Sequence, residues 1–375
     1  MISRDLTKTI NTLRNQGKAI ILTGPRQVGK TTLLKSLFRK EKSAIWLDGD
    51  DATVRERLKE AGTALLKALV ANYKIVVIDE AQRIDHIGLI GKQLVDQIPG
   101  IELLITGSSA LEVSGMTQEA MTGRKWSLQL FPLSFREMVL SHGLIDEVSL
   151  LNKRLIYGYY PEVVVNNNLE ERRLKELCES YLFKDVYSLE RIQKPEKFER
   201  LLKLLAFQIG QQVSYHELAI NTGLDVSTVE RYIDLLEKAF VVFRVPSFQR
   251  NRRNELKKSK KIYFVDNGVR NAVIGLWSPS GLRQDCGALW ENWMMSERRK
   301  LIFNEQAEVS TYFWRTTAQQ EVDLIEVSEN RIRAVDFKWN EKARGKISQA
   351  FTNSYPEASS TIISPTNFES FLLEV

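Results

Sequence analysis

The octapeptide Gly24–Thr31, Gly-Pro-Arg-Gln-Val-Gly-Lys-Thr, constrains this chain more than any other feature. It matches the pattern G-x-x-x-x-G-K-[ST] and lies between an apolar segment at 19–22 and a helical pattern at 32–38. Glycines in such a loop let backbone N–H groups surround phosphate oxygens, and the following helix N-terminus adds a favourable dipole. The spacing and its flanks therefore predict a phosphate-binding loop between a strand and a helix, in preference to an ordinary glycine-rich turn.

The positions of this loop have distinct expected roles. We expect the Lys30 ammonium to contact the β- and γ-phosphates of a nucleotide, and the Thr31 hydroxyl to bind Mg²⁺. ATP and Mg²⁺ are thus the predicted cofactors. The predicted nucleotide-binding residues are Gly24, Pro25, Arg26, Gln27, Val28, Gly29, Lys30, Thr31 and Thr32.

Two further strand patterns end in side chains that suit the same chemistry. Residues 73–80 form a run rich in valine and isoleucine that ends in Asp79 and Glu80, and such a run is typical of a strand buried on both faces. We expect Asp79 to hold Mg²⁺ and Glu80 to polarise the attacking water. Adjacent acids after a strand also occur at helix starts, but the upstream loop favours the catalytic interpretation. After the strand pattern at 101–106, Thr106 and Ser108 are candidates for contact with the γ-phosphate.

Strand and helix patterns divide the 375 residues into three predicted domains. Residues 1–142 alternate strands and helices, which predicts an α/β domain with a parallel sheet covered on both faces. A capping-box pattern at Ser134 and Glu137 begins its last helix. Residues 143–280 are mainly helical, with two short helical patterns around a glycine turn at 213–236 and then two strand patterns. That succession predicts a helix-turn-helix followed by a wing, a winged helix.

Composition limits the class of protein. Hydrophobic residues make up 43% of the chain and charged residues 27%, which is typical of a soluble globular protein. No apolar run approaches the roughly 18 residues that a membrane span needs, and the N-terminus lacks the core of a signal peptide. Two cysteines, Cys178 and Cys286, cannot form a disulfide framework or a thiolate zinc site, so we expect a reducing cytoplasm.

The net charge of +6 is unevenly distributed. Seven basic residues crowd the predicted wing: Arg250, Arg252, Arg253, Lys257, Lys258, Lys260 and Lys261. The predicted contacts with the phosphates of duplex or branched DNA are Arg250, Arg252, Arg253, Lys257 and Lys258, with Thr228 and Arg231 on the second helix of the pair. Glu230 and Asp234 on that helix would repel phosphate, so a protein-packing role for the helix pair stays open. A cationic surface would also suit RNA or an acidic protein.

Residues 281–375 return to strand patterns that carry another set of acids. Asp323 and Asp336 lie on neighbouring predicted strands, and Lys338 shares a face with Asp336 because side chains alternate along a strand. These residues suit a divalent cation with a lysine beside the attacking water. The alternative is an ordinary lysine–aspartate pair on a solvated strand.

Taken together, these motifs resemble the bacterial and archaeal AAA-type ATPases that carry a DUF4143 C-terminal region. The resemblance covers nearly the whole chain and also includes Thr122-Gly123-Arg124, Gly158-Tyr159-Tyr160-Pro161-Glu162 and Lys261–Gly268. One departure is Tyr159, where the family tends to have a second glycine. The resemblance implies an ATPase core with Arg124 as an arginine finger or sensor. If Arg124 acts from a neighbouring copy, the active form is a homo-oligomer.

The C-terminal region resembles the PD-(D/E)XK (restriction-endonuclease-like) nuclease fold, especially archaeal Holliday junction resolvases. The resemblance rests on Gly287-x-x-x-Glu291, Asp323, Asp336-x-Lys338 and Gln349, and it implies metal binding by Glu291, Asp323 and Asp336. Such folds also persist as inactive binding modules. Two hypotheses therefore remain: a Mg²⁺-dependent ATPase that binds and cleaves DNA, or a slow nucleotide-dependent switch that binds DNA or a partner protein without nuclease activity.

Overall fold

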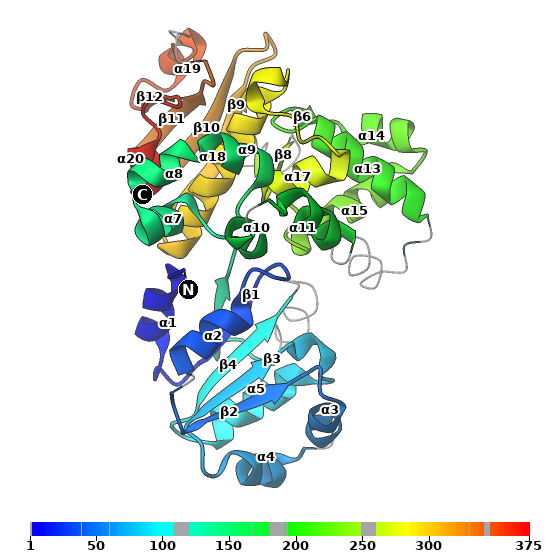
Figure 1. The fold of residues 1–375 in the computed structure, drawn as a ribbon, viewed down its shortest axis with the longest axis vertical. Coiled ribbons are helices and arrows are strands. Elements are labelled where there is room, and N and C mark those ends of the chain that lie inside the picture. Colours follow the sequence, from blue (N-terminus) through cyan, green and yellow to red (C-terminus); the bar gives the residue numbers. More distant parts are fainter. Residues whose placement is uncertain are drawn as a thin grey trace. The chain divides into compact units, whose positions relative to one another are not determined.

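The computed structural model describes residues 2–38, 40–59, 61–108, 120–166, 168–179, 192, 194–248, 260–329, 331–340 and 346–375. The chain forms two compact units, which we describe separately (Figure 1). Unit 1 comprises Met1–Pro132 with Lys238–Phe240, and unit 2 comprises Leu133–Glu237 with Val241–Val375. The three predicted domains, with boundaries after residues 142 and 280, stay a prediction.

A five-stranded parallel sheet forms the centre of unit 1, in the order β2-β3-β4-β1-β5. Every residue of β3 is buried, as expected for a strand that is covered on both faces. The parallel sheet predicted for this part of the chain is therefore confirmed. Its strands are β1 (Ala19–Thr23), β2 (Ala44–Asp48), β3 (Ile75–Asp79), β4 (Glu102–Gly107) and β5 (Lys125–Gln129).

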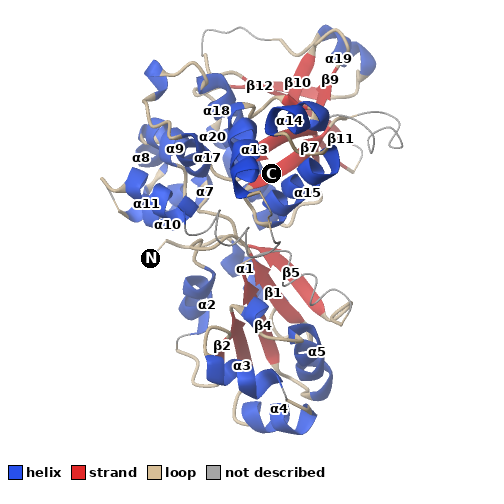
Figure 2. Cartoon of the chain, turned by 90° about the vertical axis from the view of Figure 1, so that its right-hand side faces the viewer, coloured by secondary structure: helices blue, strands red, loops and turns tan. Residues whose placement is uncertain are grey.

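Helices cover both faces of this sheet, with α2 and α5 on opposite sides (Figure 2). Alternate strand residues, such as Ile21, Ile78 and Ile105, pack into one apolar core with Ile90 and Leu94 of α5. This core gives the sheet a rigid carboxyl edge from which loops project. The helices are α1 (Leu6–Leu13), α2 (Lys30–Phe38), α3 (Ala52–Lys59), α4 (Thr63–Val70) and α5 (Ile87–Gln97), with a 3₁₀ turn, η1, at Ala81–Arg83.

Unit 2 begins with a run of short helices. The first of them starts at the predicted capping box: the Ser134 hydroxyl accepts from the Glu137 N–H, and the Glu137 carboxylate accepts from the Ser134 N–H. That prediction is confirmed. The helices are α7 (Phe135–His142), α8 (Leu144–Ser149), α9 (Leu151–Tyr157), α10 (Pro161–Val165), α11 (Glu170–Leu177) and α13 (Pro195–Phe207).

A helix pair and a small sheet follow α13. Helix α14 (Tyr215–Thr222) ends at Gly223, which adopts the left-handed conformation, and α15 (Val226–Lys238) begins after a short turn. Strands β6 (Gln212–Val213), β7 (Val242–Pro246) and β8 (Lys260–Phe264) form an antiparallel sheet in the order β6-β8-β7. Two helices joined by a tight turn and followed by two paired strands are the elements that the sequence indicated here.

The C-terminal part of unit 2 builds a second sheet, in the order β12-β11-β10-β9. Three of its strands are antiparallel, and β12 pairs with β11 in parallel. The register shifts within β10 between Val322 and Ile325, so Asp323 lies at an irregularity of the strand. The elements are α17 (Asn267–Ile274), η3 (Ser280–Leu282), α18 (Cys286–Asn304), β9 (Ser310–Arg315), β10 (Glu321–Ser328), β11 (Arg331–Phe337), α19 (Gln349–Ser354), β12 (Ser359–Ile363) and α20 (Glu369–Leu373).

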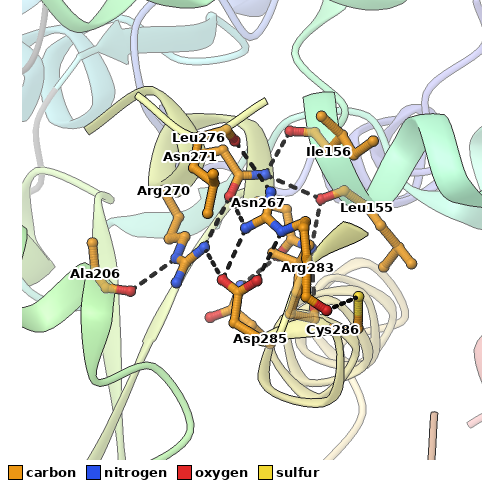
Figure 3. A network of polar contacts seen from close by, with 12 residues as sticks. Leu155, Ile156, Ala206, Asn267, Arg270, Asn271, Leu276, Arg283, Asp285 and Cys286 are labelled. Atoms are coloured by element: carbon orange, nitrogen blue, oxygen red, sulfur yellow. Dashed lines mark hydrogen bonds and ion pairs between the residues drawn. The ribbon is translucent and has the colours of Figure 1, made fainter. Parts of the chain in front are cut away.

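A buried polar network joins α17 to the segment that precedes α18 (Figure 3). Arg270 is 1% exposed, and its guanidinium pairs with Asp285 at 2.6 Å and donates to the Ala206 carbonyl at 2.8 Å. Arg283 also pairs with Asp285, at 2.8 Å. A buried guanidinium is costly without a partner, so Asp285 stabilises Arg270 in this position. Arg270 thereby connects α17 with the end of α13 at Ala206 and with the segment that precedes α18.

Candidate functional site

The loop Gly24–Thr31 joins the carboxyl end of β1 to the first turn of α2. Two glycines permit its shape. A Cβ at Gly24 would lie 2.1 Å from the Leu130 carbonyl oxygen, and Gly29 has a φ of 93°, a value that favours glycine. Since the carboxyl ends of parallel strands meet at one edge, the loop lies beside the ends of its neighbouring strands, with Thr23 paired to Gly107 of β4.

Lys30 is the buried cation of this loop. Its ammonium donates hydrogen bonds to the carbonyl oxygens of Gly24 at 2.9 Å and Pro25 at 2.8 Å. Burial lowers the pKa of Lys30 to about 8, although the carboxylates of Glu80 and Asp79 oppose this shift. A desolvated ammonium whose hydrogen bonds go to carbonyl oxygens gains stabilisation when phosphate oxygens approach it. The arrangement therefore suits a phosphate ligand.

Asp79 and Thr31 meet where a magnesium ion would bind. The Thr31 hydroxyl donates to Asp79 Oδ2 at 2.7 Å, and the Thr106 hydroxyl donates to Asp79 Oδ1. Hydroxyl and carboxylate oxygens are hard ligands, and Mg²⁺ typically takes one or two such groups together with waters and substrate phosphates. The donor set thus fits Mg²⁺ bound with a nucleotide, and Thr106 orients the carboxylate from the neighbouring strand.

Glu80 follows β3 in the left-handed backbone conformation, with φ 47° and ψ 42°. That conformation costs a non-glycine residue about 1–2 kcal/mol, so surrounding contacts must hold it. Gln82 Nε2 donates to Glu80 Oε2 at 2.6 Å and to the Ser108 hydroxyl at 3.1 Å. The amide of Gln82 therefore links the predicted catalytic carboxylate to one of the two candidate γ-phosphate contacts.

Two residues at this site were missed by sequence reasoning. Arg4 donates hydrogen bonds to the carbonyl oxygens of Val28 and Phe131, each at 2.7 Å, and so fastens the loop to a neighbouring segment. Nothing in the local sequence marks Arg4, because its partners are distant along the chain. Gln82 offered a signal that was overlooked, since a polar amide two residues after a catalytic acid can reach that acid in a tight turn.

The remaining predicted nucleotide-binding residues differ in how exposed their side chains are. Val28 is buried within the loop, Gln27 is exposed with a φ of 61°, and Thr32 is exposed in the first turn of α2. Pro25 is buried and Arg26 is partly exposed. Their contact with a nucleotide stays a prediction.

Arg124 lies at the opposite edge of the sheet from this loop. It directly precedes β5, whose first residue Lys125 pairs with Ala19 at the start of β1, whereas the loop follows the end of β1. A five-residue strand spans about 16 Å, so Arg124 does not reach a nucleotide held by its own loop. Its guanidinium pairs instead with Asp96 of α5 at 2.7 Å. A role as a sensor in its own chain is therefore wrong, and only contact with a neighbouring copy stays a prediction.

The four residues predicted for a nuclease-like site lie in unit 2. Glu291 is on α18, Asp323 on β10 and Asp336 on β11, and Lys338 follows β11. Lys338 Nζ pairs with Asp336 Oδ2 at 2.8 Å; burial opposes its charge, but this hydrogen bond raises the pKa of Lys338 above its usual value. Lys338 is thus an ion-pair partner of Asp336, although its side chain remains 35% exposed. Gln349, also predicted, begins α19.

Lys261, which was not predicted for this site, also contacts these carboxylates. Lys261 of β8 is fully buried, and its ammonium pairs with Glu291 at 2.9 Å, with Glu321, and more distantly with Asp323 at 3.8 Å. Burial raises the pKa of Asp323 well above its usual range; Glu291 and Asp336 add to the shift and Lys261 opposes it. Among the described residues, no three histidine, cysteine or acidic side chains are placed to hold a metal ion. The predicted metal set of Glu291, Asp323 and Asp336 therefore does not form as such.

The predicted DNA-contacting residues are only partly described. Arg250, Arg252, Arg253, Lys257 and Lys258 lie outside the described residues. Lys261, which belongs to the same basic cluster in the sequence, is buried among carboxylates. Asp225 caps the start of α15: its carboxylate accepts from the Thr228 N–H at 2.8 Å and from the Thr228 hydroxyl at 2.7 Å. Arg231, further along α15, is exposed.

Comparison with protein families matches three successive segments of the chain. Residues 16–139 match a family described as an AAA domain, residues 148–280 a domain of unknown function, DUF8612, and residues 286–372 a domain of unknown function, DUF4143. Together with the parallel sheet and the loop geometry, these matches support a P-loop ATPase with a C-terminal DUF4143 region.

Relatives are found in bacteria and archaea. An uncharacterised protein of Mycobacterium tuberculosis is 28% identical over 330 residues, which cover 87% of this chain and 71% of the relative. An uncharacterised protein of Methanocaldococcus jannaschii is 24% identical over 354 residues, covering 88% and 76%. Among solved structures, a Walker-type ATPase of Pyrococcus abyssi has a TM-score of 0.50 at 15% identity, covering 73% of this chain and 96% of that one. The likeness to that structure concerns the fold.

Two findings bear on where such a protein resides. None of the described helices has the length and hydrophobicity needed to cross a bilayer. Cys178 and Cys286 are both buried and free. A cytoplasmic location stays a prediction.

Proposed function

We propose that this chain is a Mg²⁺-dependent ATPase whose activity is coupled to contact with DNA through unit 2. The observation that carries the ATPase part is the 2.7 Å hydrogen bond between the Thr31 hydroxyl and Asp79, beside the buried Lys30. A hydroxyl and a carboxylate at that position are the oxygen ligands that Mg²⁺ uses when it binds with nucleotide phosphates.

The residues of unit 1 have separate roles in binding the phosphates and in holding Mg²⁺. Lys30 contacts the β- and γ-phosphates, and the loop N–H groups enclose their oxygens. Thr31 and Asp79 would hold a magnesium ion, which would supply positive charge beside the phosphates. Because the loop and the end of β3 belong to one rigid sheet edge, binding and catalysis use the same scaffold.

Glu80 is the group that accepts the proton of the attacking water. Its carboxylate lies at the same sheet edge, and Gln82 holds it in place by a hydrogen bond of 2.6 Å. A general base must be positioned before its pKa matters. Gln82 is therefore a positioning residue, acting through Glu80, and Ser108 joins the same hydrogen-bonded group on the side of β4.

Binding of the phosphates is tested by removing the cation of the loop. Lys30→Ala should abolish tight binding of ATP, measured by titration calorimetry, because the phosphate oxygens lose their central partner. Lys35→Ala is the matched control, since Lys35 is an exposed lysine further along the same helix. Equal affinity of wild type and Lys30→Ala would show that the nucleotide site has been assigned to the wrong loop.

Support for a DNA partner comes from charge and from the helix pair. In the sequence, the basic residues at 250–261 lie between β7 and the start of β8, and Arg231 of the helix pair is exposed. Cations placed this way suit phosphate contacts, which position a protein on DNA without reading its sequence. DNA cleavage is not part of the proposal, because Lys261 occupies the carboxylate cluster that cleavage would require.

The DNA part is tested by the response of ATP turnover to nucleic acids. We expect duplex or branched DNA to raise the ATPase rate, and RNA and single strands to compete less well. Replacing Arg250, Arg252 and Arg253 together by glutamine should remove the stimulation and leave basal turnover unchanged. Slow turnover that ignores every nucleic acid would instead favour a nucleotide-dependent switch that binds a protein partner.

A further inference from the structure

Three acidic side chains of unit 2 gather around a single buried ammonium. Glu291 projects from α18, and Glu321 and Asp323 project from β10. Lys261 reaches them from β8, a strand of the other, three-stranded sheet of unit 2. Its Nζ lies 2.9 Å from Glu291 Oε1 and 3.8 Å from Asp323 Oδ1, and it also pairs with Glu321. The side chain of Lys261 is 0% exposed.

The surroundings of Glu291 enclose its carboxylate further. Lys261 and Tyr263 are alternate residues of β8 and so share a face, and the Tyr263 hydroxyl donates to Glu291 Oε1 at 2.6 Å. A Cβ at Gly210 would lie 3.0 Å from Glu291 Oε2. The oxygens of Glu291 are thus occupied or screened by residues that precede the C-terminal region in the sequence.

The carboxylates of Asp336 and Asp323 also have partners within this chain. Asp336 Oδ2 is held by the Lys338 ammonium at 2.8 Å, and Asp323 Oδ2 accepts from the Phe337 backbone N–H at 2.8 Å. Each carboxylate that the nuclease-like pattern assigns to a metal therefore already has a partner from this chain.

We propose that Lys261 is the resident cation of this cluster, and that its ammonium takes the place of a divalent metal between Glu291, Glu321 and Asp323. A metal ion and an ammonium cannot share that space, because like charges a few ångströms apart repel strongly where water is excluded. Because Lys261 is completely buried, its ammonium cannot move into solvent to make room for a metal ion. Unit 2 accordingly binds no Mg²⁺ at this cluster and does not cleave DNA there.

The consequence is structural. The cluster fastens β8 to α18 and β10. Carboxylates buried without a cation carry a large desolvation penalty, so Lys261 is needed for the described arrangement. This inference goes beyond the proposed ATPase, which uses only residues of unit 1.

The direct test uses the nucleotide-free protein. Electron paramagnetic resonance measures how much Mn²⁺ binds, and thermal unfolding measures whether Mn²⁺ changes the Tm. We expect wild type and Asp323→Asn to bind the same amount of Mn²⁺, and Mn²⁺ to leave the Tm of wild type unchanged. Binding by wild type that is lost in Asp323→Asn would overturn the proposal. So would Mg²⁺-dependent DNA cleavage by wild type that is lost in Asp336→Asn.

Removing the ammonium should create the site that it now fills. Lys261→Met retains the apolar stem, and we expect a lower Tm that rises by several degrees when Mn²⁺ is added. In Lys261→Met combined with Asp323→Asn this rise should be lost. A Lys261→Met protein that folds but gains no stability from Mn²⁺ would contradict the proposal. If Lys261→Met does not fold, the comparison of wild type with Asp323→Asn still decides, and ATP turnover reports on unit 1 separately.

Discussion

Raising the pH should weaken nucleotide binding through the buried ammonium of Lys30. In the nucleotide-free protein, burial lowers the pKa of Lys30 from the usual 10.5 to about 8, and the charged groups that face it are Glu80, Asp79 and Arg26. Phosphate oxygens favour the charged ammonium, so nucleotide binding raises this pKa again.

The sign and size of the effect follow from proton linkage. Below pH 8 the ammonium keeps its proton in both states, and affinity does not depend on this group. Above pH 8 binding requires the uptake of a proton, so affinity falls by up to tenfold for each pH unit until the pKa of the complex is reached. A return from about 8 to 10.5 corresponds to about 3 kcal/mol, since one pKa unit is worth about 1.36 kcal/mol.

The assay is a titration with a fluorescent ATP analogue at several values between about pH 7 and about pH 9.5. Lys30→Arg is the control, because a guanidinium stays charged throughout this range and its affinity should be flat. Flat affinity of the wild type, or the same decline in Lys30→Arg, would refute the assignment of the effect to Lys30.

Other changes test separate parts of the account. Gln82→Ala should lower kcat by roughly 10- to 100-fold with little change in ATP affinity, because Glu80 loses the amide that positions it; steady-state kinetics separate the two constants. Gly24→Ala should cost about 1–3 kcal/mol of unfolding free energy in denaturant titration, since the added methyl group meets a backbone carbonyl. Asp285→Ala should destabilise unit 2 by about 3 kcal/mol, because Arg270 stays buried without its carboxylate; unchanged thermal unfolding would contradict this.

Local patterns predicted much of unit 1 and the first helix of unit 2. The loop at Gly24–Thr31, the buried β3 and the capping box at Ser134 depend on neighbouring residues, so periodicity and spacing were enough to locate them. The parallel sheet followed from the alternation of strands and helices. The position of Arg124 did not follow, because the sequence does not show which end of β5 lies beside the loop; only the pairing of Lys125 with Ala19 settles that.

Contacts between distant segments account for what the sequence could not predict. Arg4 reaches the loop from a different part of the chain, and Lys261 reaches carboxylates 30 and more positions away. In the sequence, Lys261 is the last residue of a basic cluster. In the folded chain its side chain is buried, because β8 turns Lys261 and Tyr263 towards Glu291 of α18.

The central claim is that Glu80 drives ATP hydrolysis at this loop, and single-turnover hydrolysis with excess protein tests it most directly. We expect Glu80→Gln to bind ATP as wild type does and to hydrolyse it at least about 100-fold more slowly, because the amide cannot accept the proton of water. Glu56→Gln, an exposed carboxylate on α3, should behave as wild type. Hydrolysis by Glu80→Gln at the wild-type rate would contradict the account.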